Sequence, residues 1–499
     1  MNFRTLALGA ALLLTAGCTI LQVQTNQPLP ENAQGQPDFA ANYGIGSFMR
    51  ERFSGTAQWT AARSDTLILL AFSGGGKRSS AFAHGALRGL RDIAVRPEGS
   101  AGWRMLDNVD YISGVSGGSF PAAHYGLYRE RHFETFPQEF LNQDINARIA
   151  GMYLLPWNWN WMVNPNAGTN DHMATVYDQL MFRGATHADL QRQGPPLISV
   201  NATDIVNGVS FQFVGNVFGT LCSDLNSFPI ARAVAASNGF PVLFSPITLE
   251  NHAARCRGVR PPTVAAVTAP FAQSPDTVSR QAELARIARI YADPEQTRFV
   301  HLMDGGIADN LALRGVLNMI VAIGTTADLY RDVARHTRRI LVLSVDGQAA
   351  NDRSLAQQPR VGGIRRIVSA VSGTQIDAYN FETIALTTEQ VAGLAQGFRQ
   401  ERCRQARVID GHPCADVEGR FVHVSLSDIE DAAIRERLQS IPTGLTIPAD
   451  DVRVLVEYGE RLVRNHPVLR TIAAATGEFS APGATRAALA SRAPSPPAR

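Results

Sequence analysis

The sequence has little net charge, a single lysine and no run of charge of one sign. Its 499 residues include 46 Lys and Arg against 44 Asp and Glu, which leaves a formal net charge of +2. Without a basic stripe or an acidic tail, we expect neither nucleic acid nor a cationic partner to bind. With 45% hydrophobic and 18% charged residues and no internal repeat, the chain predicts a globular fold with a large core, as one big domain with insertions or two smaller ones.

Cysteine is scarce, and the first of the five residues follows a leader sequence. Met1 to Arg4 supplies a positive start, Leu6 to Leu14 an apolar run too short to span a membrane comfortably, and Thr15-Ala16-Gly17-Cys18 a small-residue cleavage site. The pattern predicts export. It also resembles a bacterial lipoprotein box, with Thr15 where Leu is usual, and this resemblance implies cleavage before Cys18 and a lipid on its thiol. An ordinary secretory peptide is the alternative.

The lipoprotein resemblance implies a lipid-anchored protein of the bacterial cell envelope. Thr19, not Asp, follows the cysteine, which by similarity to the sorting rules of some bacteria favours the outer membrane, facing the periplasm. The other four cysteines are an even number, as disulfide pairing in an exported chain requires. Pairing of nearer neighbours is one of three possible connectivities, and because no Cys-x-x-Cys or clustered His spacing is present, we predict no metal and no other cofactor. These cysteines are Cys222, Cys256, Cys403 and Cys414.

Composition divides the chain into four parts. Residues 1–17 are the predicted signal peptide, and residues 18–43 are the lipidated cysteine and a flexible tether, because Leu21 to Asn42 is rich in Gln, Asn, Pro and Gly. The folded domain, with a C-terminal elaboration, is expected over residues 44–466. Residues 467–499 are expected to hold the end of a helix and a disordered tail, because the last stretch is almost entirely Ala, Pro, Ser and Arg.

Short β-rich runs alternate with helical patterns through the folded domain. This alternation predicts an α/β fold of three layers, α/β/α, with a mainly parallel central sheet covered on both faces. The β-rich runs are Thr66–Phe72, Asp110–Ser113, Leu197–Ala202, Phe299–Met303, Arg339–Val345 and Phe421–Leu426, and the helical patterns include Ser80–Asp92, Gly118–Arg131 and Ala282–Tyr291.

A glycine-rich turn follows the first β-rich run and opens a helix. Its sequence is Ser73-Gly74-Gly75-Gly76-Lys77-Arg78-Ser79. Consecutive glycines let a backbone approach a ligand closely and present N–H groups at a helix N-terminus, as binding of a phosphate or an oxyanion requires. A single such turn is more often only a tight loop. A dinucleotide site is disfavoured because Ser79 replaces the third glycine of G-x-G-x-x-G, and a P-loop because Arg78 follows the lysine.

The second β-rich run leads into Gly114-Val115-Ser116-Gly117-Gly118. This is a G-x-S-x-G match between a strand and a helix, the context in which a sharp turn exposes a nucleophilic serine. A third glycine turn supplies a base: the run Phe299–Met303 ends at Asp304-Gly305-Gly306, and Asn310 follows. Asp304 is therefore expected at the C-terminal end of a strand, where ligands bind in open α/β sheets. Each motif alone is common by chance.

Together and in this order, the three motifs resemble the patatin-like phospholipase family, whose fold is similar to the catalytic domain of cytosolic phospholipase A2. The resemblance runs from about Thr66 to Leu313, half of the chain. It includes the small-residue segment from Ile230 to Pro241, whereas Ser79 and Leu311-Ala312 depart from the family pattern. It implies Ser116 as nucleophile and Asp304 as catalytic aspartate, with Gly74, Gly75, Gly76 and Lys77 as the oxyanion hole and Arg78, Gly114, Gly118, Gly305, Gly306 and Asn310 in support.

The resemblance implies an enzyme, a serine acyl hydrolase that cleaves ester bonds of membrane lipids through a Ser-Asp dyad. Another serine esterase or thioesterase, or a catalytically silent envelope lipoprotein, is the alternative, because fold alone does not settle function. A Ser-His-Asp triad completed by His412 or His423 would also be permissible in order, but nothing local marks either histidine. His84, on the helix after the glycine loop, is more simply a packing residue.

Two further features concern the membrane. Lys77, the only lysine, and its neighbour Arg78 could attract an anionic lipid head group at the mouth of the site. Trp157, Trp159 and Trp161 alternate with Asn after an apolar stretch, which suits either a surface that dips into a membrane interface or an internal hydrophobic subcluster. The expected partners are thus a lipid substrate and a membrane surface.

Overall fold

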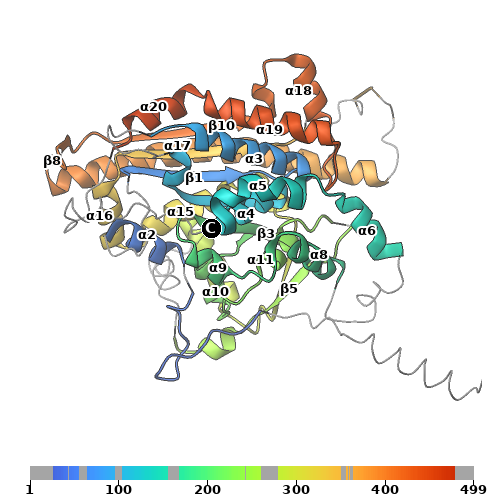
Figure 1. Ribbon diagram of the computed structural model, residues 1–499. Coiled ribbons are helices and arrows are strands. Elements are labelled where there is room, and N and C mark those ends of the chain that lie inside the picture. Colours follow the sequence, from blue (N-terminus) through green and yellow to red (C-terminus); the bar gives the residue numbers. More distant parts are fainter. Residues whose placement is uncertain are drawn as a thin grey trace, which may run out of the picture.

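The structure is a computed structural model of the chain, and it places an eight-stranded sheet at its centre (Figure 1). The strand order is β10-β7-β1-β2-β3-β6-β5, and β4 pairs with β3 off this path. The structure describes residues 26–42, 44–54, 64–95, 104–154, 168–241, 243–259, 279–349, 356, 357, 359 and 364–477. The leader with Cys18 and the three alternating tryptophans Trp157, Trp159 and Trp161 lie outside them.

Five neighbouring strands, from β10 to β3, run parallel, whereas β4, β5 and β6 pair antiparallel. The expected mainly parallel sheet is therefore confirmed, with an antiparallel edge. The strands are β1 (Thr66–Phe72), β2 (Val109–Val115), β3 (Leu197–Asp204), β4 (Val209–Gln212), β5 (Ile247–Glu250), β6 (Phe299–Met303), β7 (Arg339–Asp346) and β10 (Glu418–Ser425), and a separate pair is formed by β8 (Val408–Ile409) and β9 (His412–Pro413).

Strand β1 shows why the molecule has three layers. All seven of its residues are buried, and successive side chains point to opposite faces of the sheet. Ile68 and Leu70 enter a core that is covered by helices α3, α4, α11 and α19, whereas Leu67 and Leu69 enter a second core beneath α2, α15, α16 and α17. A strand buried on both faces needs a continuous apolar run, and β1 has one.

Helices cover both faces of the sheet, whose strands follow one another in Figure 1 from β10 near the top to β5 near the bottom. Their bounds are α2 (Ile45–Ser54), α3 (Gly76–Asp92), α4 (Ser119–Tyr128), α5 (His132–Phe136), α6 (Ile145–Leu154), α8 (Thr169–Tyr177), α9 (His187–Arg192), α10 (Gly215–Thr220), α11 (Ile230–Ser237), α13 (Arg280–Tyr291), α14 (Gly306–Asp309), α15 (Leu313–Ile323), α16 (Ala327–His336), α17 (Ile364–Gln405), α18 (Ala432–Gln439), α19 (Ala449–Arg464) and α20 (Pro467–Ala475). In the described part of the chain, no helix is both long enough and apolar enough to cross a membrane.

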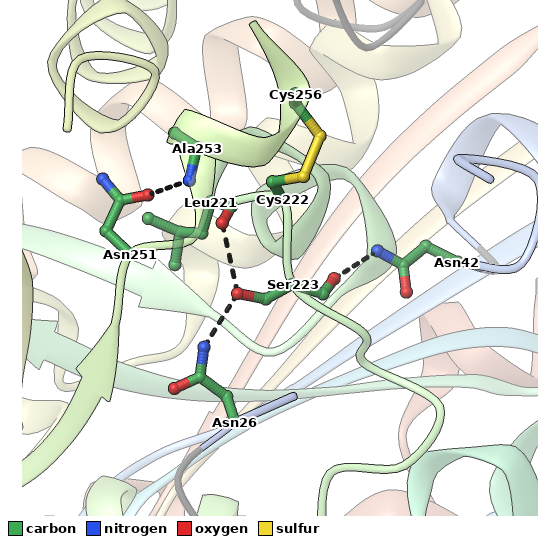
Figure 2. The surroundings of a disulfide bond; sticks show 8 residues. All are labelled: Asn26, Asn42, Leu221, Cys222, Ser223, Asn251, Ala253 and Cys256. Carbon is green, nitrogen blue, oxygen red and sulfur yellow. Dashed lines mark hydrogen bonds between the residues drawn. A yellow bond between two sulfur atoms is a disulfide. The ribbon is translucent and has the colours of Figure 1, made fainter. Parts of the chain in front are cut away.

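The folded body is longer at both ends than the sequence predicts. Residues 26–42, expected as a flexible tether, lie against the body: Asn26 Nδ2 donates to Ser223 Oγ at 2.8 Å and Asn42 Nδ2 donates to the Ser223 carbonyl at 2.8 Å (Figure 2). At the other end, α20 buries Leu469 and Ile472 in the core beyond the expected limit at residue 466. The hydrogen bonds of Asn26 and Asn42 and the short apolar face of α20 fix these two ends to the body, and neither feature can be recognised from composition alone.

Two disulfides join the four cysteines in nearer-neighbour order. Cys222 is bonded to Cys256, next to the docked N-terminal segment (Figure 2), and Cys403 is bonded to Cys414. The first bond closes a loop of 34 residues and the second a loop of 11. Closing a loop restricts the unfolded chain, so both bonds favour the folded state.

Candidate active site

Ser116 lies in a strained turn between β2 and α4. Its φ of 47° is in the left-handed region, which serine adopts at a cost, and such strain is typical of nucleophile turns. The glycines beside it allow the turn. A Cβ on Gly117 would collide with the carbonyl of Gly76, and one on Gly118 with the carbonyl of Phe72. The turn after β2 is thus packed directly on the glycine loop after β1.

Asp304 follows strand β6, and its side chain reaches Ser116. Ser116 Oγ donates a hydrogen bond to Asp304 Oδ2 at 2.9 Å, although the residues are 188 positions apart. Asp304 is at the C-terminal end of β6, as predicted, but β6 runs antiparallel to β3, with Met303 opposite Thr203. The aspartate therefore arrives at the carboxyl ends of β2 and β3 from the opposite direction to the parallel strands.

The protein holds Asp304 by its backbone as well as by its carboxylate. Its N–H donates to the carbonyl of Gly239 at 3.1 Å, and its carbonyl accepts from Thr203 Oγ1 at 2.8 Å. Its second carboxylate oxygen, Oδ1, accepts from the Gly306 N–H at 2.8 Å. A Cβ on Gly305 would collide with Val115 and with the Asn201 carbonyl. Gly305 thus lets the aspartate turn pack against β2 and β3, and Gly306 leaves room for the Asp304 carboxylate and Asn310.

Burial tunes the Asp304 carboxylate toward neutral pH. The residue is only 9% exposed, and Ser116 is 4% exposed. Loss of water around the charged form raises the pKa of Asp304 to about 6, and the hydrogen bonds from Gly306 and Ser116 oppose part of this rise. A carboxylate with this pKa is still mostly ionised at pH 7, and it is a stronger base than an exposed aspartate.

Two of the four predicted oxyanion donors are already engaged. The Gly74 N–H donates to the Asn310 carbonyl at 2.8 Å, and the Lys77 N–H donates to the Gly444 carbonyl at 2.8 Å. The N–H groups of Gly75 and Gly76, at the start of α3, donate to no group among the described residues. The predicted oxyanion hole therefore narrows to these two glycines, whose φ values of 132° and 63° favour glycine.

The predicted role of Lys77 and Arg78 at the mouth of the site is wrong, because both side chains are buried. Lys77 Nζ donates to the Gln143 carbonyl, and burial lowers the pKa of this amine to about 8. Arg78 Nε donates to the Gly347 carbonyl at 2.7 Å, and another of its nitrogens donates to the Ile441 carbonyl. These bonds hold three distant segments, at Gln143, Gly347 and Ile441, against the glycine loop, so the cations act on the protein and not on a head group.

The remaining supporting residues lie where the motifs put them. Gly114 cannot carry a Cβ without crowding the Gly118 carbonyl, which is 2.8 Å from the ideal position. Asn310 Oδ1 lies against Gly74, and its Nδ2 donates to Gln348 Oε1 at 3.1 Å. Asn310 thereby braces the start of the glycine loop by both its main-chain carbonyl and its side chain.

Two site residues were missed by motif analysis, Ser237 and Asn238 at the end of α11. Ser237 Oγ accepts from the Ser116 N–H at 2.8 Å, and Asn238 Oδ1 lies 3.2 Å from Ser116 Oγ. The small-residue segment from Ile230 to Pro241 was part of the family resemblance but had no assigned role. Its small side chains let α11 approach the turn that carries Ser116, and that packing was the available signal.

Neither candidate triad histidine contacts Ser116. His423 Nδ1 lies 3.2 Å from Ser344 Oγ in the strand pair β7–β10, and His412 belongs to the separate pair β8–β9 near Cys414. His84 is buried and contacts His132. Among the described residues, no three His, Cys, Asp or Glu side chains are arranged to hold a metal ion.

Comparison with known proteins identifies the protein family to which this domain is similar. A family model described as patatin-like phospholipase matches residues 70–317, which include the glycine loop, Ser116 and Asp304. The chain thus belongs to the patatin-like phospholipase family through this domain. Among solved structures, human GIVD cytosolic phospholipase A2 is similar, with 12% identity and a TM-score of 0.32 over 64% of this chain and 51% of that one, so the chain spans about half of its length. No curated protein matches the chain.

Proposed function

We propose that this protein is a serine acyl hydrolase that cleaves ester bonds of membrane lipids, with Ser116 as nucleophile and Asp304 as base. The observation that carries the proposal is the 2.9 Å hydrogen bond from Ser116 Oγ to Asp304 Oδ2 in a buried turn. The patatin-like family supplies the substrate class, lipid esters. A serine next to a base with a pKa near the working pH is the arrangement that nucleophilic catalysis requires.

In the first half-reaction, Ser116 Oγ attacks the ester carbonyl carbon while its proton passes to Asp304 Oδ2. The carbonyl π electrons move to the oxygen, which becomes an oxyanion facing the Gly75 and Gly76 N–H groups. One such donor is worth roughly 3 to 4 kcal/mol of barrier. When the tetrahedral intermediate collapses, the bond to the alcohol breaks, Asp304 returns the proton to the departing alkoxide, and the acyl group stays on Ser116.

In the second half-reaction, water replaces the alcohol. The water oxygen attacks the acyl carbon, and Asp304 accepts a proton from this water. A second oxyanion forms at the same two N–H groups, the bond to Ser116 Oγ breaks, and the proton on Asp304 returns to that oxygen. The products are a fatty acid and the regenerated serine, with no other co-reactant.

The test combines covalent labelling with product analysis. The purified protein should react with a fluorophosphonate probe and release fatty acid from phospholipid vesicles, and Ser116→Ala and Asp304→Asn should abolish both. Ser344→Ala is a matched control, because Ser344 is equally buried but lies within strand β7. A wild-type protein that neither labels nor releases fatty acid would sink the proposal. Release from acyl thioesters or neutral glycerides alone would instead identify another esterase.

We also propose that the protein is exported and lipid-anchored at Cys18, in the outer membrane facing the periplasm. Two disulfides support an oxidising compartment, since such bonds rarely persist in the cytosol. Trp157, Trp159 and Trp161 would add contact with the membrane surface. Mass spectrometry of the mature protein should find a lipidated N-terminal cysteine, and Cys18→Ala should release the protein from membranes. An unmodified Cys18 in the mature chain would refute the anchor.

A further inference from the structure

Asn238 contacts the reacting oxygen of the site and has no assigned role in the dyad. It directly follows α11, and its backbone N–H donates to the Val234 carbonyl at 3.0 Å. Its side-chain amide lies between two hydroxyls. Oδ1 is 3.2 Å from Ser116 Oγ, and Nδ2 is 3.2 Å from the hydroxyl of Tyr177. Both Asn238 and Tyr177 are buried, so each polar atom there needs a partner within the protein.

The count of hydrogens favours the amide turned by half a revolution. Ser116 Oγ has one hydrogen, and the shorter contact, 2.9 Å to Asp304, takes it. An amide oxygen facing Ser116 Oγ at 3.2 Å would then meet only lone pairs. The half-turn places an N–H donor against Ser116 Oγ and leaves the amide oxygen to accept the Tyr177 hydroxyl proton. Each of the three contacts among Tyr177, Asn238, Ser116 and Asp304 then joins one hydrogen to one acceptor.

We propose that Asn238 is a third catalytic residue, whose side-chain N–H donates to Ser116 Oγ while its oxygen accepts from the Tyr177 hydroxyl. This inference rests on the proposed function of the dyad. The resulting chain runs in one direction, from Tyr177 to Asn238 to Ser116 to Asp304. It points the Ser116 proton at the carboxylate, and it places an N–H where negative charge develops as Oγ loses that proton.

Tyr177 is suited to the first position in this chain. Its ring packs edge-on against Phe120 of α4 at 4.9 Å, which fixes the hydroxyl relative to the turn that carries Ser116. Burial and the nearby Asp304 charge raise the pKa of Tyr177 further above its ordinary value. The phenol therefore keeps its proton at any working pH and acts as a fixed donor. Within this series of hydrogen bonds Tyr177 is bonded to Asn238 and not to Ser116 or Asp304, so it is a positioning residue.

The first experiment measures nucleophilicity without a lipid surface. Phosphonylation by a fluorophosphonate probe and turnover of p-nitrophenyl butyrate should both slow by about 10- to 100-fold in Asn238→Leu and Asn238→Ala. The loss should appear in kcat with KM unchanged, because the missing contact is to Ser116 Oγ. Asn170→Ala is the matched control. It removes a buried amide on α8 that donates to the Ala235 carbonyl of α11, the helix that Asn238 follows. Thermal unfolding of each variant separates chemistry from misfolding.

Tyr177→Phe tests the direction of the chain. With the amide oxygen facing Tyr177, loss of the hydroxyl removes its donor, the amide is freed to rotate, and the phosphonylation rate should fall several-fold. With the opposite orientation, loss of the hydroxyl would let the amide turn its N–H to Ser116, and the rate would hold or rise. Tyr128→Phe, which removes a hydroxyl bonded to the Met181 carbonyl, is the control.

The outcomes separate this inference from the proposed function. A wild-type protein that labels at Ser116, with Asn238→Leu and Asn238→Ala no slower than Asn170→Ala, overturns the role of Asn238 and leaves the dyad standing. An unchanged or faster Tyr177→Phe overturns the proposed orientation. A wild-type protein that never labels overturns the dyad and, with it, the third residue.

Discussion

Two buried clusters of polar side chains lie near the glycine loop and its helix, and burial affects the titratable groups of the two clusters in opposite ways. One is the Ser116–Asp304 pair. The other is a chain of three histidines, His84 on α3, His132 on α5 and His124 on α4. His132 Nε2 lies 2.9 Å from His84 Nδ1, and His132 Nδ1 lies 3.0 Å from His124 Nδ1. The three imidazoles are at most 1% exposed.

The histidine chain ends on a carboxylate, which fixes its protons. Glu139 Oε2 lies 2.8 Å from His124 Nε2, and hydrogen bonds from His124 and from Arg183 outweigh burial and lower the pKa of Glu139. An ionised Glu139 must accept, so His124 donates from Nε2 and accepts at Nδ1. His132 then donates from Nδ1 and accepts from His84. All three rings can be neutral with every shared nitrogen satisfied.

The comparison shows that the sign of a group's charge decides what burial does. Burial raises the pKa of Asp304 to about 6, and it lowers the pKa of His84 to about 3 and that of His132 well below its ordinary value. Near pH 7 the acid is an ionised base beside a nucleophile. The histidines are neutral and act as a hydrogen-bonded link between α3 and α4, the helices that begin at the glycine loop and at Ser116.

The strongest test of this difference is Asp304→Asn. Removing the base should lower kcat by about 10⁴-fold. It should also stabilise the fold, because an ionised buried carboxylate with its pKa raised by roughly two units costs roughly 3 kcal/mol at neutral pH. Activity and urea unfolding would be measured on the same preparation. A variant that is inactive and also less stable would make Asp304 a structural residue like those of the histidine chain.

His132→Phe should show the opposite pattern. Phenylalanine keeps an aromatic ring at this position but has no ring nitrogens, so His84 Nδ1 and His124 Nδ1 each lose a buried partner. The free energy of unfolding should fall by about 2 to 5 kcal/mol. His187→Phe is the matched control, since His187 is also buried but makes one bond, to the Phe228 carbonyl at 2.8 Å. Phosphonylation of the folded variant should change little. A large loss of labelling without a loss of stability would give the histidine chain a direct part in the chemistry.

The sequence predicts the first half of the site better than the second. β1 and the first two glycine motifs are local patterns, so their strands, turns and helices were correctly predicted. The direction of β6 was not predicted at all, because the five-residue run Phe299–Met303 carries no sign of which neighbouring strand it pairs with. The oxyanion donors were overcounted because the Lys77 N–H is taken by the carbonyl of Gly444, a residue far along the chain. Contacts of that range have no local signal.

Acid unfolding compares the two clusters in a single titration. The histidines have folded pKa values below their unfolded value of about 6.5, so below pH 6.5 the unfolded chain binds more protons. As the pH is lowered, the free energy of unfolding should then decrease by up to about 1.4 kcal/mol per pH unit for each histidine. Asp304 acts oppositely, because its raised pKa makes the folded state bind more protons between about pH 6 and 4. The charged side chains facing the histidines are Arg88, Arg91, Arg131, Arg183 and Glu139.

Urea unfolding at a series of pH values between 7 and 4 measures this balance. Within the two clusters three histidines outweigh one aspartate, so together they should lower the stability of the wild-type protein as the pH falls. Asp304→Asn should steepen the loss, because it removes the opposing group, and His132→Phe should make it shallower. A loss of stability that is equally steep in His132→Phe and in the wild-type protein would mean that the three histidines are not held neutral.

The smallest effect should be the pH dependence of activity itself. Only ionised Asp304 can accept the Ser116 proton, so kcat/KM should be flat above about pH 6 and should fall tenfold per unit below it. Acid unfolding through the histidine chain could produce a similar fall, so each sample is returned to pH 7.5 and assayed again: full recovery assigns the limb to titration of a folded enzyme. His132→Phe, assayed where it remains folded, should keep the same midpoint, because the two clusters share no side chain. A midpoint near pH 4, the range of an exposed aspartate, would mean that burial does not tune Asp304, and the contrast between the clusters would then fail on its acid side.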